Sequence, residues 1–151
     1  MKMPICGQLD RFLFKLLVGF PSREEMHGIL KITTGNVDEQ FHTVLNRDQI
    51  IEFKKFVRSV PVADHIVDYA IRLVQATHPH QVNAPEITRK YVRFGASPRG
   101  AQAMLLTAKI KALMDERFSV AFDDLRQVAK PALRHRLILN FEGEAEGVAT
   151  D

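Results

Sequence analysis

One stretch of this 151-residue chain has the pattern of a β-strand. In residues 11–20, RFLFKLLVGF, apolar side chains alternate along both faces and Pro21 follows, which is typical of a strand buried on both sides. A single strand cannot form a sheet, so its partner is missing from the sequence pattern. We therefore expect a helical protein with one unpaired strand, whose free edge invites pairing between chains or disorder.

The remaining sequence carries helix start signals, each followed by apolar residues at helical spacing. The starts are predicted at Ser22, Asn46, Asp64, Ser97, and Asp123 or Asp124. The first two have Glu25 and Gln49 three residues later, which is the spacing of a capping box. Pro131 is expected to bend the last helix, and residues 78–96 have the pattern of a small hairpin. The predicted fold class is all-α, a bundle of about five helices.

Composition limits the location and the partners of the protein. The formal charge is +3, and the last ten residues hold four acidic residues without any lysine or arginine. The basic remainder favours a phosphate-bearing or acidic partner, and the acidic tail is predicted to be disordered. No apolar run approaches the roughly 20 residues of a membrane helix. With a lone cysteine, Cys6, and no leader-like start, we expect a cytoplasmic protein without membrane contact.

Several site motifs are disfavoured. His78 and His80 flank a proline and match no zinc spacing, so no metal site is predicted. Cys6 has no signature that ties it to a base. The LRHRL stretch, residues 133–137, could bind nucleic acid, but a helix C-terminus favours cations anyway, so nucleic-acid binding is disfavoured. No glycine is followed by lysine, which excludes a phosphate-cradling P-loop from this sequence.

One predicted helix start carries an unexpected charge. Ser97 suits the N-cap and Pro98 the first helical position, which leaves Arg99 in a first turn that favours anions. Arginine presents a planar fork suited to phosphate oxygens. The partner of Arg99 is therefore either a ligand phosphate or an acid of the chain such as Glu86. Arg11, at the mouth of the strand candidate, is the second arginine that we single out.

Four motifs in order carry a resemblance to a known family. They are QLDRF (8–12), VGFPSREE (18–25), GASPRGAQAML (95–105) and ALRHRLILNFE (132–142). Together they make the chain similar to the C-terminal third of a MoxR-type AAA+ ATPase. The resemblance implies that residues 1–20 are a remnant of the ATPase core with its last strand. Residues 21–141 would be the helical lid domain and residues 142–151 a disordered acidic tail.

The resemblance also implies roles for individual residues. Arg11 matches an arginine that resembles an arginine finger, which would act in trans on the nucleotide of a neighbouring subunit. Arg99, with Ser97 and Pro98, matches the Ser-Pro-Arg of the sensor-2 position, which would contact the γ-phosphate in its own or a neighbouring subunit. ATP and Mg²⁺ are the cofactors implied for the full-length parent. The fragment alone is expected to bind none and to be inactive as an ATPase.

The implied function is that of a lid that couples ATP binding and hydrolysis to chaperone-like remodelling of a partner protein. Its partners would be the missing AAA+ core, neighbouring subunits of a hexamer, and a von Willebrand factor A-domain protein. The alternative is a stand-alone helical protein-interaction module without ATP dependence. A basic nucleic-acid-binding bundle is a weaker third interpretation. An upstream reading frame containing Gly-Lys-Ser/Thr would decide between the first two.

Overall fold

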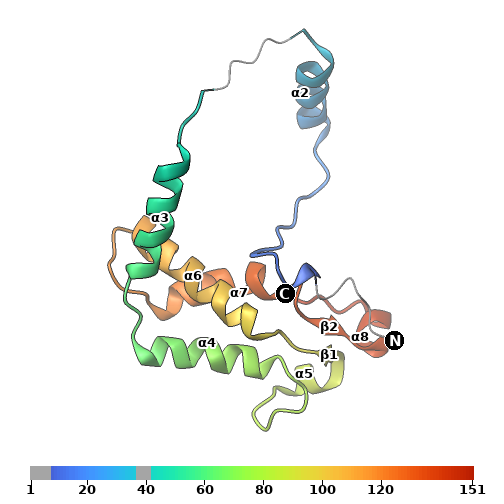
Figure 1. Ribbon diagram of the computed structural model, residues 1–151. Helices are drawn as coiled ribbons and strands as arrows, with labels where there is room; N and C mark the ends of the chain where they lie inside the picture. The colour runs from blue at the N-terminus through green and yellow to red at the C-terminus, as the bar shows by residue number, and fades with distance from the viewer. Residues whose placement is uncertain (1–7, 37–41) are drawn as a thin grey trace.

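The computed structural model describes residues 8–36 and 42–151 and forms a helical bundle with one small sheet (Figure 1). In chain order the elements are α2 (Arg23–Thr34), α3 (Arg47–Ser59), α4 (Asp64–Ala76), α5 (Glu86–Tyr91), β1 (Val92–Phe94), α6 (Pro98–Met114), α7 (Phe122–Leu133), β2 (Ile138–Leu139) and α8 (Phe141–Ala145). The all-α prediction is confirmed. None of the described helices combines the length and apolarity that crossing a bilayer requires.

The hydrophobic core lies where α6 packs against α4 and α7. Its buried side chains from these three helices are Ile66, Ala70, Val74, Ala103, Met104, Ala108, Ala112, Leu125, Val128, Ala132 and Leu133. Alanines on α6 allow its backbone to approach both neighbours closely, while Met104 and Leu125 fill the volume between them. The core thereby fixes the position of the first turn of α6.

Local sequence signals explain most helix starts. Ser22 and Asn46 form capping boxes as predicted, and the side chain of Ser97 accepts a hydrogen bond from the backbone N–H of Arg99 at 3.2 Å. The prediction that Asp64 caps α4 is wrong, because α4 begins at Asp64 itself and Ala63 makes no side-chain cap.

The small sheet joins distant parts of the sequence. β1 pairs antiparallel with β2, and Val92 lies opposite Leu139. The prediction of a hairpin within residues 78–96 is therefore wrong: this region contains α5, and β1 finds its partner near the C-terminus. Alternating apolar residues predict an extended segment, but they do not identify the segment with which it pairs.

The predicted strand over residues 11–20 is not formed. In the described ranges, the strands are β1 and β2, which pair with each other. Val18 and Phe20 are 90% and 89% exposed, so the stretch is not buried on both faces either. The physical reason is that a strand needs the hydrogen bonds of a neighbouring strand, and in the described part of the chain residues 16–20 make no backbone hydrogen bonds to another segment.

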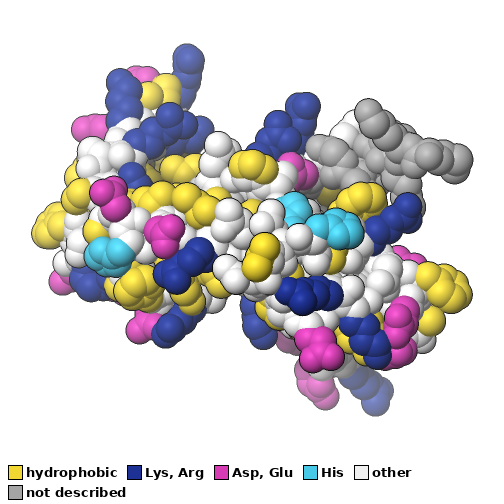
Figure 2. All heavy atoms as spheres, turned by 90° about the horizontal axis from the view of Figure 1, so that it is seen from below, with side chains coloured by type: hydrophobic (Ala, Val, Ile, Leu, Met, Phe, Trp, Pro, Cys, Tyr) yellow, Lys and Arg dark blue, Asp and Glu magenta, His cyan; other side chains and the backbone are white. Residues whose placement is uncertain are grey.

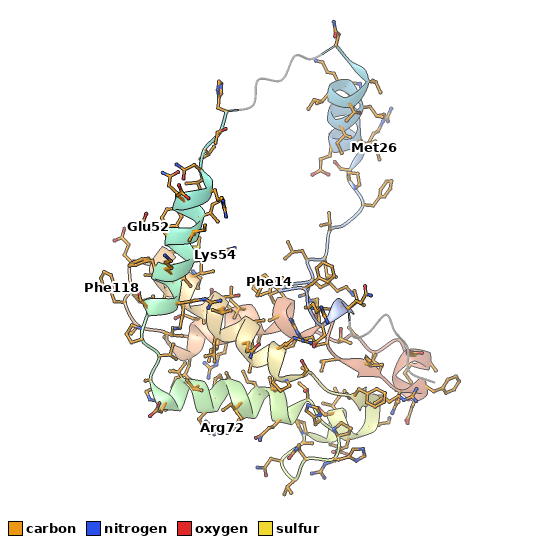
Figure 3. The ribbon with its side chains drawn as sticks, in the orientation of Figure 1. Phe14, Met26, Glu52, Lys54, Arg72 and Phe118 are labelled. Atoms are coloured by element: carbon orange, nitrogen blue, oxygen red, sulfur yellow. The ribbon has the colours of Figure 1, made fainter. Side chains whose placement is uncertain are left out.

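The helix α2 stands apart from the bundle in Figure 1 and buries none of its residues. Met26, labelled in Figure 3, lies on this helix, far from the core. Ile29, Leu30 and Ile32 on α2 are all exposed. The helical conformation of α2 is therefore stabilised by local interactions such as its capping box and not by packing against the bundle.

The prediction of a disordered tail over residues 142–151 is wrong. Asn140 caps α8 by accepting a hydrogen bond from the N–H of Gly143 at 2.9 Å. Gly143 is buried against Tyr91 of α5, where a Cβ atom would lie only 3.1 Å from the Tyr91 carbonyl oxygen. Acidic composition alone predicted disorder, but the Asn140 cap and the contact of Gly143 with Tyr91 together order the start of the tail.

Candidate functional site

Arg99 lies in the first turn of α6, as predicted, and its side chain is 54% exposed. Its Nη1 donates to Oδ2 of Asp10 at 3.1 Å. An acid of the chain therefore meets this arginine, and that acid is Asp10 rather than Glu86. A nucleotide phosphate is not required to explain the charge of Arg99 in this state of the molecule.

Asp10 is the centre of the site. Its two carboxylate oxygens each accept from Ser97 Oγ at 2.9 Å, and Oδ1 also accepts from Arg136 Nε at 3.1 Å. Burial raises the pKa of this carboxyl, but the hydrogen bonds from Ser97, Arg99 and Arg136 outweigh burial and hold the pKa of Asp10 below its usual value. Asp10 is therefore a carboxylate shared by two arginines and a serine, a group that we call the Asp10 cluster.

Arg136 anchors the cluster and the chain around it. Its side chain is only 3% exposed and donates to the carbonyl oxygens of Asp10 at 3.0 Å and Phe12 at 2.7 Å, as well as to that of Ala132. Burial lowers the pKa of Arg136, although a guanidinium stays charged in proteins. One buried cation therefore satisfies a side-chain carboxylate and several backbone carbonyls at once.

The two residues before Arg136 hold the same N-terminal segment. His135 Nε2 lies 3.0 Å from the Phe12 carbonyl oxygen, and Arg134 Nη1 lies 3.4 Å from that of Lys15. Lys15 also donates its backbone N–H to the Pro131 carbonyl at 3.0 Å. We call residues 10–15 the docked segment; its Phe14, labelled in Figure 3, packs against the core.

These contacts change the interpretation of the LRHRL stretch. Arg134 and Arg136 direct their charges to the chain's own carbonyl groups and to Asp151 and Asp10. Elsewhere, Figure 2 shows charges of both signs scattered among exposed apolar side chains on the face it presents. Neither observation is typical of a nucleic-acid-binding surface, which gathers cations on one face.

The structure brings the two singled-out arginines to one end of the bundle. Arg11 follows Asp10 directly and is exposed, while Asp10 contacts Arg99. Ser97, the α6 N-terminus and Arg99 together form a donor set suited to phosphate oxygens. In residues 8–36 and 42–151, no group of three or more histidine, cysteine, aspartate or glutamate side chains is placed to hold a metal ion.

Comparison with known proteins finds similar sequences over nearly the whole chain. Residues 84–151 match the AAA lid domain family. The chain is 33% identical to the uncharacterized protein YeaC of Bacillus subtilis over 146 residues, covering 96% of this chain and 43% of YeaC. It is also 33% identical to the chaperone MoxR1 of Mycobacterium tuberculosis over 146 residues, covering 96% of this chain and 38% of MoxR1.

A solved structure has a similar fold. The crystal structure of a candidate ATPase from Cytophaga hutchinsonii superimposes with a TM-score of 0.83 at 30% identity, covering 99% of this chain and 46% of that one. The chain corresponds to the C-terminal, lid-containing portion of a MoxR-type AAA+ ATPase. It spans less than half the length of each of these relatives.

Sequence reasoning on this MoxR-type lid missed two residues of the site, Asp10 and Arg136. The sequence did contain a signal: both lie in motifs, QLDRF and ALRHRLILNFE, that carry the family resemblance. The motifs did not indicate that these two residues pair, because they lie 126 residues apart in the sequence.

Proposed function

We propose that this chain is the nucleotide-sensing lid of a MoxR-type ATPase, coupling ATP binding and hydrolysis to chaperone-like remodelling of a partner protein. The observation that carries the proposal is the position of Arg99. Its guanidinium is half-exposed at the N-terminus of α6 and faces an acid, so it can exchange that acid for a phosphate approaching from solvent. Ser97 and Pro98 fix the turn that presents it.

Arg11 is proposed as an arginine finger that acts in trans. It is exposed, and the docked segment that carries it is fixed by Arg136 and His135. A guanidinium presented in this way can stabilise charge on the γ-phosphoryl group of a neighbouring subunit. ATP and Mg²⁺ would be bound by a nucleotide-binding core outside this sequence. To that site the chain would contribute Arg99 in its own or a neighbouring subunit and Arg11 in a neighbouring one.

The exposed apolar residues support an attached core. Leu16, Val18 and Phe20 are exposed in an extended segment, as expected for a strand whose sheet belongs to the core. We propose that residues 1–20 complete that sheet, that the lid begins at residue 21, and that neighbouring subunits form a hexamer. A von Willebrand factor A-domain protein as client and a cytoplasmic location remain predictions.

The alternative, a protein-interaction module without ATP dependence, is favoured by one observation: Asp10 already satisfies Arg99. The test is a chimera in which this chain replaces the matching portion of the Cytophaga relative. Arg99→Ala should lower kcat for ATP hydrolysis by about a hundred- to a thousandfold. Arg72→Ala, which removes an exposed arginine on α4, is the matched control and should have no effect. Unchanged hydrolysis in Arg99→Ala would contradict the sensor role and favour the module.

A further inference from the structure

We propose that Asp10 is an internal counter-ion of Arg99 that competes with nucleotide phosphate for the same guanidinium and so sets the affinity of the lid for nucleotide. This inference rests on the proposed function of Arg99 and adds a positioning residue to it. Asp10 does not touch the nucleotide; it acts through Arg99.

Asp10 is held from two sides that differ in exposure. Arg136, on one side, is 3% exposed, and Arg99, on the other, is 54% exposed. A buried ion pair cannot lose one partner without leaving a desolvated charge, whereas an exposed pair is worth little and exchanges readily. An incoming phosphate would therefore take Arg99 away from Asp10 and leave the pair between Asp10 and Arg136 in place.

The carboxylate also occupies the position in which α6 favours an anion. Ser97 Oγ donates to Asp10 while accepting the N–H of Arg99 at 3.2 Å, so Asp10 lies at the start of a 17-residue helix. Helix N-termini stabilise negative charge, whether it belongs to a carboxylate or a phosphate. Asp10 thus offers Arg99 the same kind of partner as a phosphate would, but with a smaller charge.

Arg136 and His135 determine what happens to the rest of the docked segment after the exchange. They hold the carbonyl oxygens of Asp10 and Phe12 independently of Arg99. The segment therefore stays docked when Arg99 leaves, and Arg11 keeps its place on the exposed side. The exchange is confined to the Arg99 guanidinium. The backbone N–H of Lys15 reports whether the segment is docked, and it should remain protected.

The test measures the Kd of a non-hydrolysable ATP analogue in the chimera described above. Asp10→Asn removes the competing charge with little change of shape and should tighten binding about two- to fivefold, the amount expected for loss of one exposed ion pair. Arg99→Ala should weaken binding. In the Arg99→Ala background, Asp10→Asn should have no further effect. Asp68→Asn, which removes an exposed carboxylate paired with Arg72 on α4, is the matched control.

The outcomes separate the two proposals. If Arg99→Ala leaves the Kd unchanged, the proposed function fails and this inference fails with it. Two outcomes would leave the proposed function standing, with Arg99→Ala weakening binding, but would show that Asp10 is no competitor. In the first, Asp10→Asn does not tighten binding. In the second, Asp10→Asn tightens binding by the same factor in the wild-type and Arg99→Ala backgrounds. Hydrogen exchange at Lys15 checks docking in each variant. Should Asp10→Asn undock the segment, the wild-type chimera provides the test: the pKa of the Asp10 carboxyl, followed by NMR, should rise when the analogue binds because Arg99 no longer donates to it, and an unchanged pKa would contradict the exchange.

Discussion

His135 and Phe12, 123 residues apart in the sequence, are joined by a hydrogen bond of 3.0 Å between the His135 Nε2 and the Phe12 carbonyl oxygen. Because a carbonyl only accepts, Nε2 carries the proton when the ring is neutral. The other ring nitrogen, Nδ1, is buried without a hydrogen-bond partner in the described part of the chain. Protonation of His135 would place a second N–H in that buried position.

Docking of residues 10–15 should therefore weaken in acid. Burial lowers the pKa of His135 from 6.5, the bond to Phe12 opposes this, and the charge of Arg136 adds to the lowering. A folded pKa below the unfolded value means that the stabilisation is complete above pH 6.5 and is lost as pH falls below it. The hydrogen-exchange protection factor of the Lys15 amide should therefore be constant above pH 6.5 and drop as the pH falls below that value.

Two variants test the assignment of this acid sensitivity. His135→Gln keeps a side-chain N–H donor and cannot titrate, so protection at Lys15 should no longer drop below pH 6.5. His80→Gln, at an exposed position, should behave as wild type. A persistent pH dependence in His135→Gln would show that another group is responsible.

Asp124 should stabilise the start of α7 through its charge. It is 2% exposed and accepts from the Ala121 N–H at 2.8 Å and from Arg117 Nη2 at 2.6 Å. The Arg117 hydrogen bond, against burial, holds the pKa of Asp124 below 3.8. Asp124→Asn should lower the free energy of unfolding by about 1–3 kcal/mol in urea titrations at pH 7, as for other unsatisfied buried groups.

The pH dependence of this contribution follows from the same shift. A carboxyl with a lowered folded pKa stabilises fully above its unfolded value of 3.8, and the gain disappears as pH falls below that value. The difference between wild type and Asp124→Asn should shrink in acid. Asp123→Asn, one residue earlier and exposed, should cost less than half a kilocalorie, roughly the limit for surface substitutions. Equal losses in the two variants would contradict the role of Asp124.

The helix starts at Ser22, Asn46 and Ser97 were predictable because their caps are encoded within a few residues. The Ser22–Glu25 and Asn46–Gln49 boxes need no knowledge of the rest of the fold. Much of the core was equally accessible, because the buried residues of α4, which are Ile66, Ala70 and Val74, follow the helical spacing of apolar residues that predicted the helix. Local chemistry decides these features, so a single sequence suffices.

The site depended on pairings that the sequence does not encode locally. Asp10 and Arg136 are 126 residues apart, and no local pattern assigns one of many acids to one of many cations. The strand over residues 11–20 failed for a related reason, because a sheet partner lies outside the pattern that predicts a strand. The incorrect prediction of disorder over residues 142–151 was avoidable, because Asn140 is a residue type that favours helix N-caps.

Gly95 should not tolerate a side chain. A Cβ atom at this position would lie 2.6 Å from the carbonyl oxygen of Thr77, a backbone atom that cannot move without shifting the end of α4. Gly95→Ala should therefore destabilise by about 1–3 kcal/mol. Gly28→Ala on α2 meets open space and should raise helix content by circular dichroism, because alanine is the better helix former. A neutral Gly95→Ala would mean that the loop is not packed as described.

Truncation of Leu125 should destabilise the protein far more than truncation of Leu17. Leu125 is fully buried between α6 and α7, so Leu125→Ala should cost about 2–5 kcal/mol in denaturant unfolding. Leu17→Ala makes the same change at an exposed position and should stay within about 0.5 kcal/mol. Similar losses at the two positions would indicate that residues 16–20 are buried in solution, for instance by pairing between chains.

Two arginines on one carboxylate should contribute unequally to stability. Arg99→Ala removes an exposed partner of Asp10 and should cost less than about 1 kcal/mol. Arg136→Gln removes the buried partner and several donors to the docked segment, so it should cost about 3–5 kcal/mol and abolish protection of the Lys15 amide. Urea unfolding and hydrogen exchange measure both effects. If Arg99→Ala proves the more destabilising, Arg99 is a structural anchor, and the exchange of Asp10 for phosphate at its guanidinium becomes energetically untenable.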